Sequence, residues 1–232
     1  MKRARSFARR GGAALLLLLL FWTASQLASR LPWIGALGTS VHALGLGDYS
    51  ADPWSSLAPL SMQILDSQSP WVVGIELADL EYLHLGFDPQ QGVEEQLVHR
   101  AQSDDKPTAG LETLSEELGG LEALSRDDQL RLLDQTLSEL KDSLSELQAV
   151  LSAWRRGDAA ALAALLAREY RAFPALYRPL VTARNQRWLP QIEQLLHGER
   201  NCLVVVGALH LVGDGGLLEL LRKDGFAPVQ LD

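Results

Sequence analysis

The apolar pattern between Ser125 and Trp154 strongly restricts what this chain can fold into. Apolar residues recur there at alternating spacings of three and four, at Leu130, Leu133, Leu137, Leu140, Leu144, Leu147, Leu151 and Trp154. This spacing predicts one long helix with a narrow apolar seam. Ser125 fits the N-cap position, because two aspartates would then lie in the first turn, where the helix dipole favours them. The seam must pack either on the next helix of the chain or on a second copy, as in a coiled coil.

Glycines and prolines divide the residues that follow into further helices. Gly157 fits the end of the first helix, and Asp158 fits the N-cap of a second helix over 159–170. Pro174 and Pro179 interrupt a third helical stretch that runs to His197. We therefore predict an all-helical insertion over about residues 113–197.

Short apolar runs on both sides of the insertion are typical of buried strands. They cover 71–76 (WVVGIE), 107–112 (PTAGLE) and 202–207 (CLVVVG), with weaker candidates at 33–38 and 227–231. Continuous apolar runs favour strands that helices cover on both faces. We therefore predict an α/β fold with a central, mostly parallel sheet of about five strands flanked by helices. Cys202, the one cysteine of the chain, opens the third run and is expected to be buried.

The first 30 residues differ in charge from the rest of the chain. They hold six basic residues and no acidic one, and an apolar stretch follows the first ten residues. This pattern predicts a signal peptide or an N-terminal membrane anchor, followed by one extracytoplasmic domain (periplasmic or secreted) over 31–232. Residues 31–232 carry 15 basic and 29 acidic residues, a net charge of −14 that argues against nucleic-acid binding.

His210 is the most informative candidate for a functional residue. It lies three residues after Gly207, at the carboxyl end of the predicted strand 202–207. In open α/β sheets, ligands bind at the carboxyl ends of strands, and an imidazole there suits metal binding or proton transfer. His42 follows a similar apolar run and is a second candidate. The alternative is a histidine that only hydrogen-bonds a turn.

Acidic and polar side chains could complete such a site. Glu76 and Glu112 each end a predicted strand, so their carboxylates could bind a metal ion or act as a general base. Alternatively, each glutamate caps the helix that follows it. Arg184 and Asn185 belong to a polar patch of the third helix and could hold a substrate carboxylate or a ligating glutamate. A solvated helix face is the alternative for this pair.

Motifs of several common enzyme classes are missing from the sequence. It contains no HExxH, no CxxC pair, no P-loop and no GxSxG. The zincin, zinc-ribbon, P-loop NTPase and α/β-hydrolase classes therefore have no support.

Taken together, these residues resemble the TraB/GumN family, which is related to the Tiki membrane proteases. The resemblance covers about residues 35–232 and is densest where the sequence reads VVVGALHLVG, over 204–213. Other matching stretches are VGIEL at 73–77, GV at 92–93, GLET at 110–113, Trp154 with Gly157 and Asp158, and Arg184-Asn185 with Trp188.

The resemblance implies an α/β fold in which two Gly-x-x-His motifs and strand-end glutamates form a divalent-metal site. The second motif is GALH at 207–210, whereas the first, GTSVH at 38–42, is one residue longer. Carried over to this sequence, the metal ligands (Mn, Co or Zn) would be His210, His42 and Glu76. The catalytic residues would be Glu112, Arg184 and Asn185.

These roles imply a metal-dependent, peptidase-like hydrolase that acts on a peptide or protein substrate, with the N-terminal segment as an optional membrane tether. The alternative is a family member that binds an extracellular peptide or another ligand without turnover. A third interpretation is a structural partner protein that acts through the leucine seam.

Overall fold

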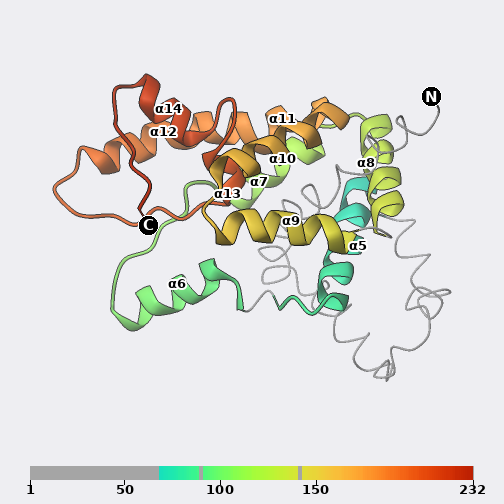
Figure 1. Cartoon of the computed structure of the whole chain (residues 1–232), viewed down its shortest axis with the longest axis horizontal. Coiled ribbons are helices and arrows are strands. Elements are labelled where there is room, and N and C mark those ends of the chain that lie inside the picture. Colours follow the sequence, from blue (N-terminus) through green and yellow to red (C-terminus); the bar gives the residue numbers. More distant parts are fainter. Residues whose placement is uncertain (1–67, 89–90, 141–142, 232) are drawn as a thin grey trace.

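The computed structural model describes residues 68–88, 91–140 and 143–231, which form helices joined by loops (Figure 1). In chain order, the elements are α5 (Pro70–His84), α6 (Val93–Ser103), α7 (Leu114–Glu122), α8 (Arg126–Glu139), α9 (Ser143–Arg155), α10 (Ala159–Ala172), α11 (Pro174–Tyr177), the π-helical turn η3 (Arg178–Thr182), α12 (Ala183–Leu196), α13 (Ala208–Leu211) and α14 (Leu217–Lys223). Within these described ranges there is no strand and no sheet.

The predicted α/β fold with a central parallel sheet is therefore wrong. The run 71–76 lies inside α5, and the runs 107–112, 202–207 and 227–231 are connecting segments. The candidate 33–38 lies outside the described residues. Cys202 is exposed rather than buried.

The local sequence explains why the first run is helical. A short continuous apolar run suits a buried helix as well as a buried strand. Pro70 occupies the first turn of α5, where its missing N–H costs nothing. Ala78 and Tyr82 continue the buried face of α5 with the spacing of four residues that a helix requires.

The leucine seam is divided between two helices, so the prediction of one long helix is also wrong. Ser125 is the N-cap of α8 as predicted, because its hydroxyl accepts from the Asp128 N–H at 3.1 Å. In α8 the buried face includes Leu132 and Thr136, whereas the seam residues Leu130 and Leu137 are 46% and 48% exposed. Leu147 of α9 packs with Ala78 and Tyr82 of α5. The seam is therefore not one continuous buried face.

The other predicted helix boundaries in this region are confirmed. Gly157 follows α9 with a positive φ of 63°, a backbone conformation that glycine adopts without steric cost. Asp158 accepts from the Ala161 N–H at 2.9 Å, as an N-cap does. Pro174 begins α11, and the helical stretch ends at Leu196.

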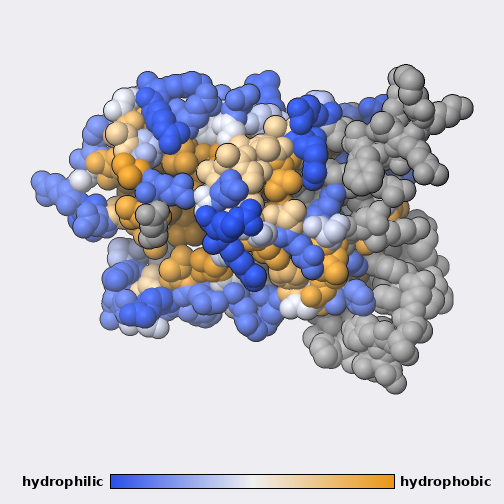
Figure 2. Space-filling model, in the orientation of Figure 1, coloured by the Kyte–Doolittle hydropathy of each residue, from blue (hydrophilic) through white to orange (hydrophobic). Residues whose placement is uncertain are grey.

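Three clusters of buried apolar residues hold the helices together. The main cluster includes residues of α5, α7, α8, α9, α10, α11, η3 and α13, and the second joins α5 to α9. The third contains Trp188, Ile192 and Leu217, and it packs α12 against α14. On the face shown in Figure 2, apolar side chains gather along the middle, with hydrophilic side chains above and below. The candidate site lies where the main and third clusters meet, at α12 and α13.

Gly120 allows α7 to lie close to η3, and this contact gives a stability prediction. A Cβ at position 120 would lie 2.7 Å from the Pro179 Cβ and 3.1 Å from the Pro179 carbonyl oxygen. We expect Gly120→Ala to lower the free energy of unfolding by about 1–3 kcal/mol, because the two backbones must move apart. Urea-induced unfolding followed by circular dichroism measures this change.

Gly119 supplies the matched control on the same helix. A Cβ at position 119 meets nothing within 4 Å. Gly119→Ala should therefore raise the free energy of unfolding by about 0.5–1 kcal/mol, because alanine favours the helix. Equal stabilities of the two variants would contradict the close approach of α7 and η3.

The predicted signal peptide or membrane anchor concerns residues 1–30, which lie outside the described residues. Within the described ranges, no helix combines the length and the apolar character that crossing a bilayer requires. The leader and the extracytoplasmic location stay predictions.

Candidate functional site

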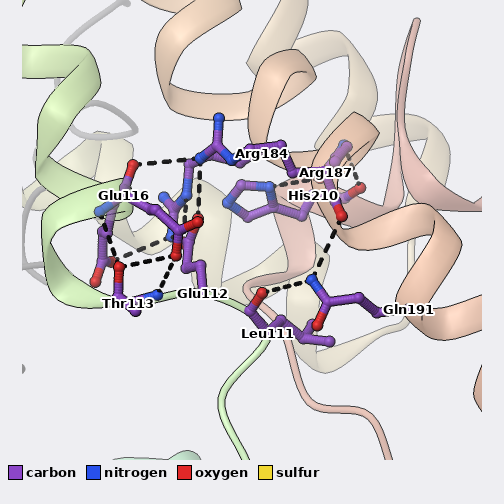
Figure 3. Close-up of polar contacts among 10 residues, drawn as sticks. Leu111, Glu112, Thr113, Glu116, Arg184, Arg187, Gln191 and His210 are labelled. Atoms are coloured by element: carbon purple, nitrogen blue, oxygen red, sulfur yellow. Dashed lines mark hydrogen bonds and ion pairs between the residues drawn. The ribbon is translucent and has the colours of Figure 1, made fainter.

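One face of α12 carries the polar side chains around which the site is built. Arg184, Asn185, Trp188 and Ile192 are buried on this helix. Their spacings of three and four residues place them on one side of α12. This side faces the connecting segment before α7 on one flank and α13 on the other, as Figure 3 shows for Arg184 and His210.

The π-helical turn η3 sets which side of α12 faces the interior. Successive residues of an α-helix are rotated by about 100°, so Leu176 and Ile192 would point in nearly opposite directions in an uninterrupted α-helix. Both residues are nevertheless buried. The wider turn η3 between them reduces the angle between their directions around the helix axis. Turns of this π type are frequent at functional sites.

Arg184 joins two acidic side chains on the first flank. Its Nε–H donates to Glu112 Oε1 at 2.8 Å, and its Nη2 donates to Glu117 Oε1 at 3.1 Å. The side chains of Arg184, Glu112 and Glu117 are only 2%, 8% and 7% exposed. Isolated buried charges are costly, so each of these groups depends on the others for neutralisation.

Two further residues of α12 hold the same segment from its exposed side. Arg187 Nη2 donates to Glu112 Oε2 at 3.1 Å and to the Glu116 carbonyl oxygen at 3.2 Å. Gln191 Nε2 donates to the Leu111 carbonyl oxygen at 2.8 Å (Figure 3). The segment 111–116 is therefore fixed to α12 by three side chains.

Asn185 links α12 to α13 on the second flank. Its Nδ2 donates to the carbonyl oxygens of His210 and Gly215, at 3.0 and 2.9 Å. Its Oδ1 lies 2.8 Å from His210 Nδ1. Because Nδ2 donates to two carbonyls, Oδ1 is the atom that faces the imidazole, and an amide oxygen can only accept a hydrogen bond. His210 therefore carries its proton on Nδ1, and Nε2 has a lone pair.

The surroundings of His210 keep the imidazole neutral. The residue is 1% exposed, and its ring lies 4.6 Å from the Trp188 ring between centroids. Burial, and secondarily the Arg184 charge, lowers the pKa of His210 to about 3. Nε2 is buried and makes no hydrogen bond to the residues that the structure describes. In Figure 3 the imidazole lies beside Arg184, on the side of Glu112.

A pocket of about 290 Å³ adjoins the site. Glu112, Glu117 and Trp188 form the part of its wall that belongs to the site. The rest of the wall comes from residues 109–111 with Leu114, and from 203–206 with Leu195. Trp188 lines the pocket and also packs against His210, so its side chain lies between the pocket and the imidazole.

Comparison with known proteins identifies the family. A model of the TraB/PrgY/gumN family matches residues 54–230, which is most of the chain. The chain belongs to this family. The resemblance predicted from the sequence is thereby confirmed.

Relatives of this TraB/PrgY/gumN protein include the uncharacterized protein YbaP of Escherichia coli (strain K12), which is 29% identical over 163 residues. YbaP of Shigella flexneri matches with the same identity over the same length. The match covers 70% of this chain and 60% of each relative, so the chain spans less than two thirds of the length of these curated relatives. No solved structure matches the chain.

The site residues predicted for this family member are only partly brought together. Arg184 binds Glu112, and Asn185 binds His210, so these four residues share one site. Glu112 does not cap the helix that follows it, because Thr113 is the N-cap of α7. Their catalytic and metal-binding roles stay predictions. His42 lies outside the described residues.

Glu76 is placed elsewhere, on α5 against α8. It lies near Asp79 rather than near His210, and burial raises the pKa of the Glu76 carboxyl group. Burial, together with the Glu76 charge, raises the pKa of Asp79 to about 8. Both carboxyl groups belong to α5, so they are not part of the site on α12 and α13.

The donor atoms of this family member fit a metal ion only in part. His210 Nε2 fits the role of a ligand, because metal-binding histidines donate their other ring N–H to a fixed acceptor, here Asn185. Glu112 and Glu117 are instead engaged by Arg184. Within the described ranges, no three His, Cys, Asp or Glu side chains form a group that could hold an ion.

Glu117 is the site residue that sequence reasoning missed. A usable signal was present, because Thr113 and Glu116 have the spacing of a capping box, which the structure confirms. That box fixes the start of α7 and places Glu117 one residue before Leu118, on the buried side. A carboxylate at such a position requires a cationic partner.

Proposed function

We propose that this chain is a metal-dependent hydrolase of the TraB/PrgY/gumN family that acts on peptides, with His210 as a metal ligand. One observation carries the proposal: a buried, neutral imidazole presents the lone pair of Nε2, and Asn185 fixes its orientation. With a pKa of about 3, His210 is too weak a base to take up protons near neutral pH. Ligation uses the neutral imidazole, so the same environment suits a metal ligand.

The residues around His210 would support hydrolysis in distinct ways. A divalent ion (Mn, Co or Zn) would polarise the scissile carbonyl group as a Lewis acid, and His42 would complete its coordination. Asn185 would keep Nδ1 protonated and the imidazole in one orientation. Arg184 would hold Glu112 at the edge of the pocket, and Glu112 Oε2 would accept a hydrogen bond from the substrate or from water, because a carboxylate oxygen has two lone pairs.

Metal uptake tests the proposal. We expect the wild-type protein, dialysed against Mn, Co or Zn, to retain a stoichiometric amount of one of them. His210→Ala should bind that metal at least about tenfold more weakly, because a ligand is lost. Elemental analysis after dialysis measures the bound metal, and digestion of a peptide library with each metal present measures activity.

His99→Ala is the matched control. His99 lies on α6 and is exposed, with the exposed Glu95 as its partner. The control should retain the wild-type metal content and activity. A wild-type protein that takes up none of the three metals would rule out the metal-dependent hydrolase.

A second candidate function is peptide binding without turnover. The observation in its favour is that Arg184 holds both Glu112 and Glu117, which leaves His210 without an acidic ligand among the described residues. Peptides that bind to the protein but stay uncut with Mn, Co and Zn present would favour this function over hydrolysis.

A further inference from the structure

The segment before α13 has the composition of a strand, but the described residues contain no strand with which it could pair. Residues 203–206 read LVVV, and valine is among the residues that most favour extended backbone. None of their backbone N–H or C=O groups has a hydrogen-bond partner in the described part of the chain. Leu203 is 77% exposed and Val204 36% exposed. An apolar segment with unpaired backbone groups is a template for the addition of another strand.

A second segment, whose N–H groups have no partner among the described residues, lines the same pocket. Residues 109–111 line the pocket together with 203–206. Their N–H groups also lack partners within the described ranges, while Gln191 holds the Leu111 carbonyl oxygen in place. The wall is anchored at its end, because Arg184 and Arg187 fix Glu112.

The volume of the pocket suits a short peptide. Residues 203–206 and 109–111 line a space of about 290 Å³, which accommodates a few residues of one chain. A chain that adds to an extended segment as a strand lies about 4.8 Å from it. Trp188 and Leu195 provide apolar contacts for alternate side chains of such a chain.

We propose that the slot between 203–206 and 109–111 binds a peptide as an added strand, hydrogen-bonded to the backbone of 203–206. The proposal deepens the proposed function, on which it rests, by naming the bound form of the substrate: an extended segment recognised mainly through its main chain. Three residues (207–209) separate 203–206 from His210 along the chain, and Trp188 both lines the pocket and packs against His210, so a peptide paired along 203–206 would lie beside the proposed metal site. Recognition of this kind tolerates many sequences, with a preference for apolar residues at alternate positions.

A proline scan of the slot tests the proposal. The four variants are Leu203→Pro, Val204→Pro, Val205→Pro and Val206→Pro, each of which removes one N–H donor. Along a strand, the backbone groups of alternate residues face the same side. We therefore expect two alternate variants to weaken binding by about tenfold or more, and the two between them to change it little. The unaffected pair serves as the matched control.

The probe is a fluorescently labelled, capped heptapeptide of alternating valine and threonine, whose binding is followed by fluorescence anisotropy. Circular dichroism checks that each variant keeps its helices, which we expect because 203–206 makes no backbone hydrogen bonds within the described residues. N-methylation of alternate amides of the probe should reproduce the pattern from the peptide side. Failure of the wild-type protein to bind the probe overturns the proposal, and so does an equal loss in all four variants.

The binding test is independent of catalysis when it is made on His210→Ala without added metal. Retained binding with the alternating pattern, together with a wild-type protein that cleaves no peptide with Mn, Co or Zn, supports the slot and counts against the hydrolase. Cleavage by the wild-type protein that none of the four prolines alters supports the hydrolase and overturns the slot. A dimer that dissociates in the proline variants would assign 203–206 to a second copy of the chain and also overturn the proposal.

Discussion

Replacing Arg184 with methionine is expected to lower the free energy of unfolding by about 3–5 kcal/mol, the typical cost of removing one partner from a buried ion pair. The change removes the guanidinium that contacts both Glu112 and Glu117, whose side chains are only 8% and 7% exposed. Each carboxylate then remains in the interior without this positive charge. Urea-induced or thermal unfolding at pH 7 measures the loss.

Arg187→Met is the control for this prediction. Arg187 contacts the same glutamate, but its side chain is 42% exposed, so its replacement should change the free energy of unfolding by no more than about 1 kcal/mol. Adding Glu112→Gln and Glu117→Gln to Arg184→Met should recover part of the lost stability, because the buried negative charges are removed as well. Equal stabilities of Arg184→Met and Arg187→Met would show that the three groups do not form the buried array described.

Asn185→Leu is expected to cost about 2–4 kcal/mol. Leucine has nearly the shape of asparagine but cannot hydrogen-bond, so the change leaves the carbonyl oxygens of His210 and Gly215 and the Nδ1–H of His210 without their partner. Buried polar groups left unsatisfied cost about 1–3 kcal/mol each, and partial relaxation reduces their sum. Chemical unfolding of the variant and of the wild type measures the difference.

Gln186→Leu provides the comparison, because Gln186 is the next residue of α12 and is exposed. Its replacement should change the free energy of unfolding by no more than about 0.5 kcal/mol. Asn185→Leu should in addition weaken metal binding by about 10–100-fold, since the orientation of His210 is no longer fixed. An Asn185→Leu protein as stable as Gln186→Leu would contradict the role of Asn185 as the link between α12 and α13.

The helix boundaries could be predicted from sequence because short-range chemistry sets them. Ser125 and Asp158 each bond a backbone N–H three residues later, and Gly157 supplies a positive φ. A sheet was predicted wrongly, because the periodicity of a short apolar run such as 71–76 does not distinguish a buried helix from a buried strand. The break of the leucine seam between α8 and α9 depends on which face of each helix packs against its neighbours, and the spacing of the leucines does not encode this.

Four of the candidate site residues lie together although the predicted scaffold was wrong. His210 and Glu112 were singled out because each follows an apolar run, and Arg184 and Asn185 because they form a polar patch inside a helix; their catalytic and metal-binding roles stay predictions. Which partner each residue takes depends on contacts between distant parts of the chain, such as the pair of Arg184 with Glu112, 72 residues apart. Glu76 was grouped with them through the predicted sheet and the family resemblance, and the structure places it on α5 instead.

The central claim is that His210 is neutral, with its proton on Nδ1 and a lone pair on Nε2. The most direct test is ¹⁵N NMR of histidine-labelled, chelator-treated protein between pH 7 and pH 4, with His210→Ala identifying the resonances of His210. We predict the Nδ1-protonated neutral form over this whole range, because burial and Arg184 lower the pKa of His210 to about 3. A proton on Nε2, or an imidazole that becomes doubly protonated near its ordinary pKa of about 6.5, would contradict the claim.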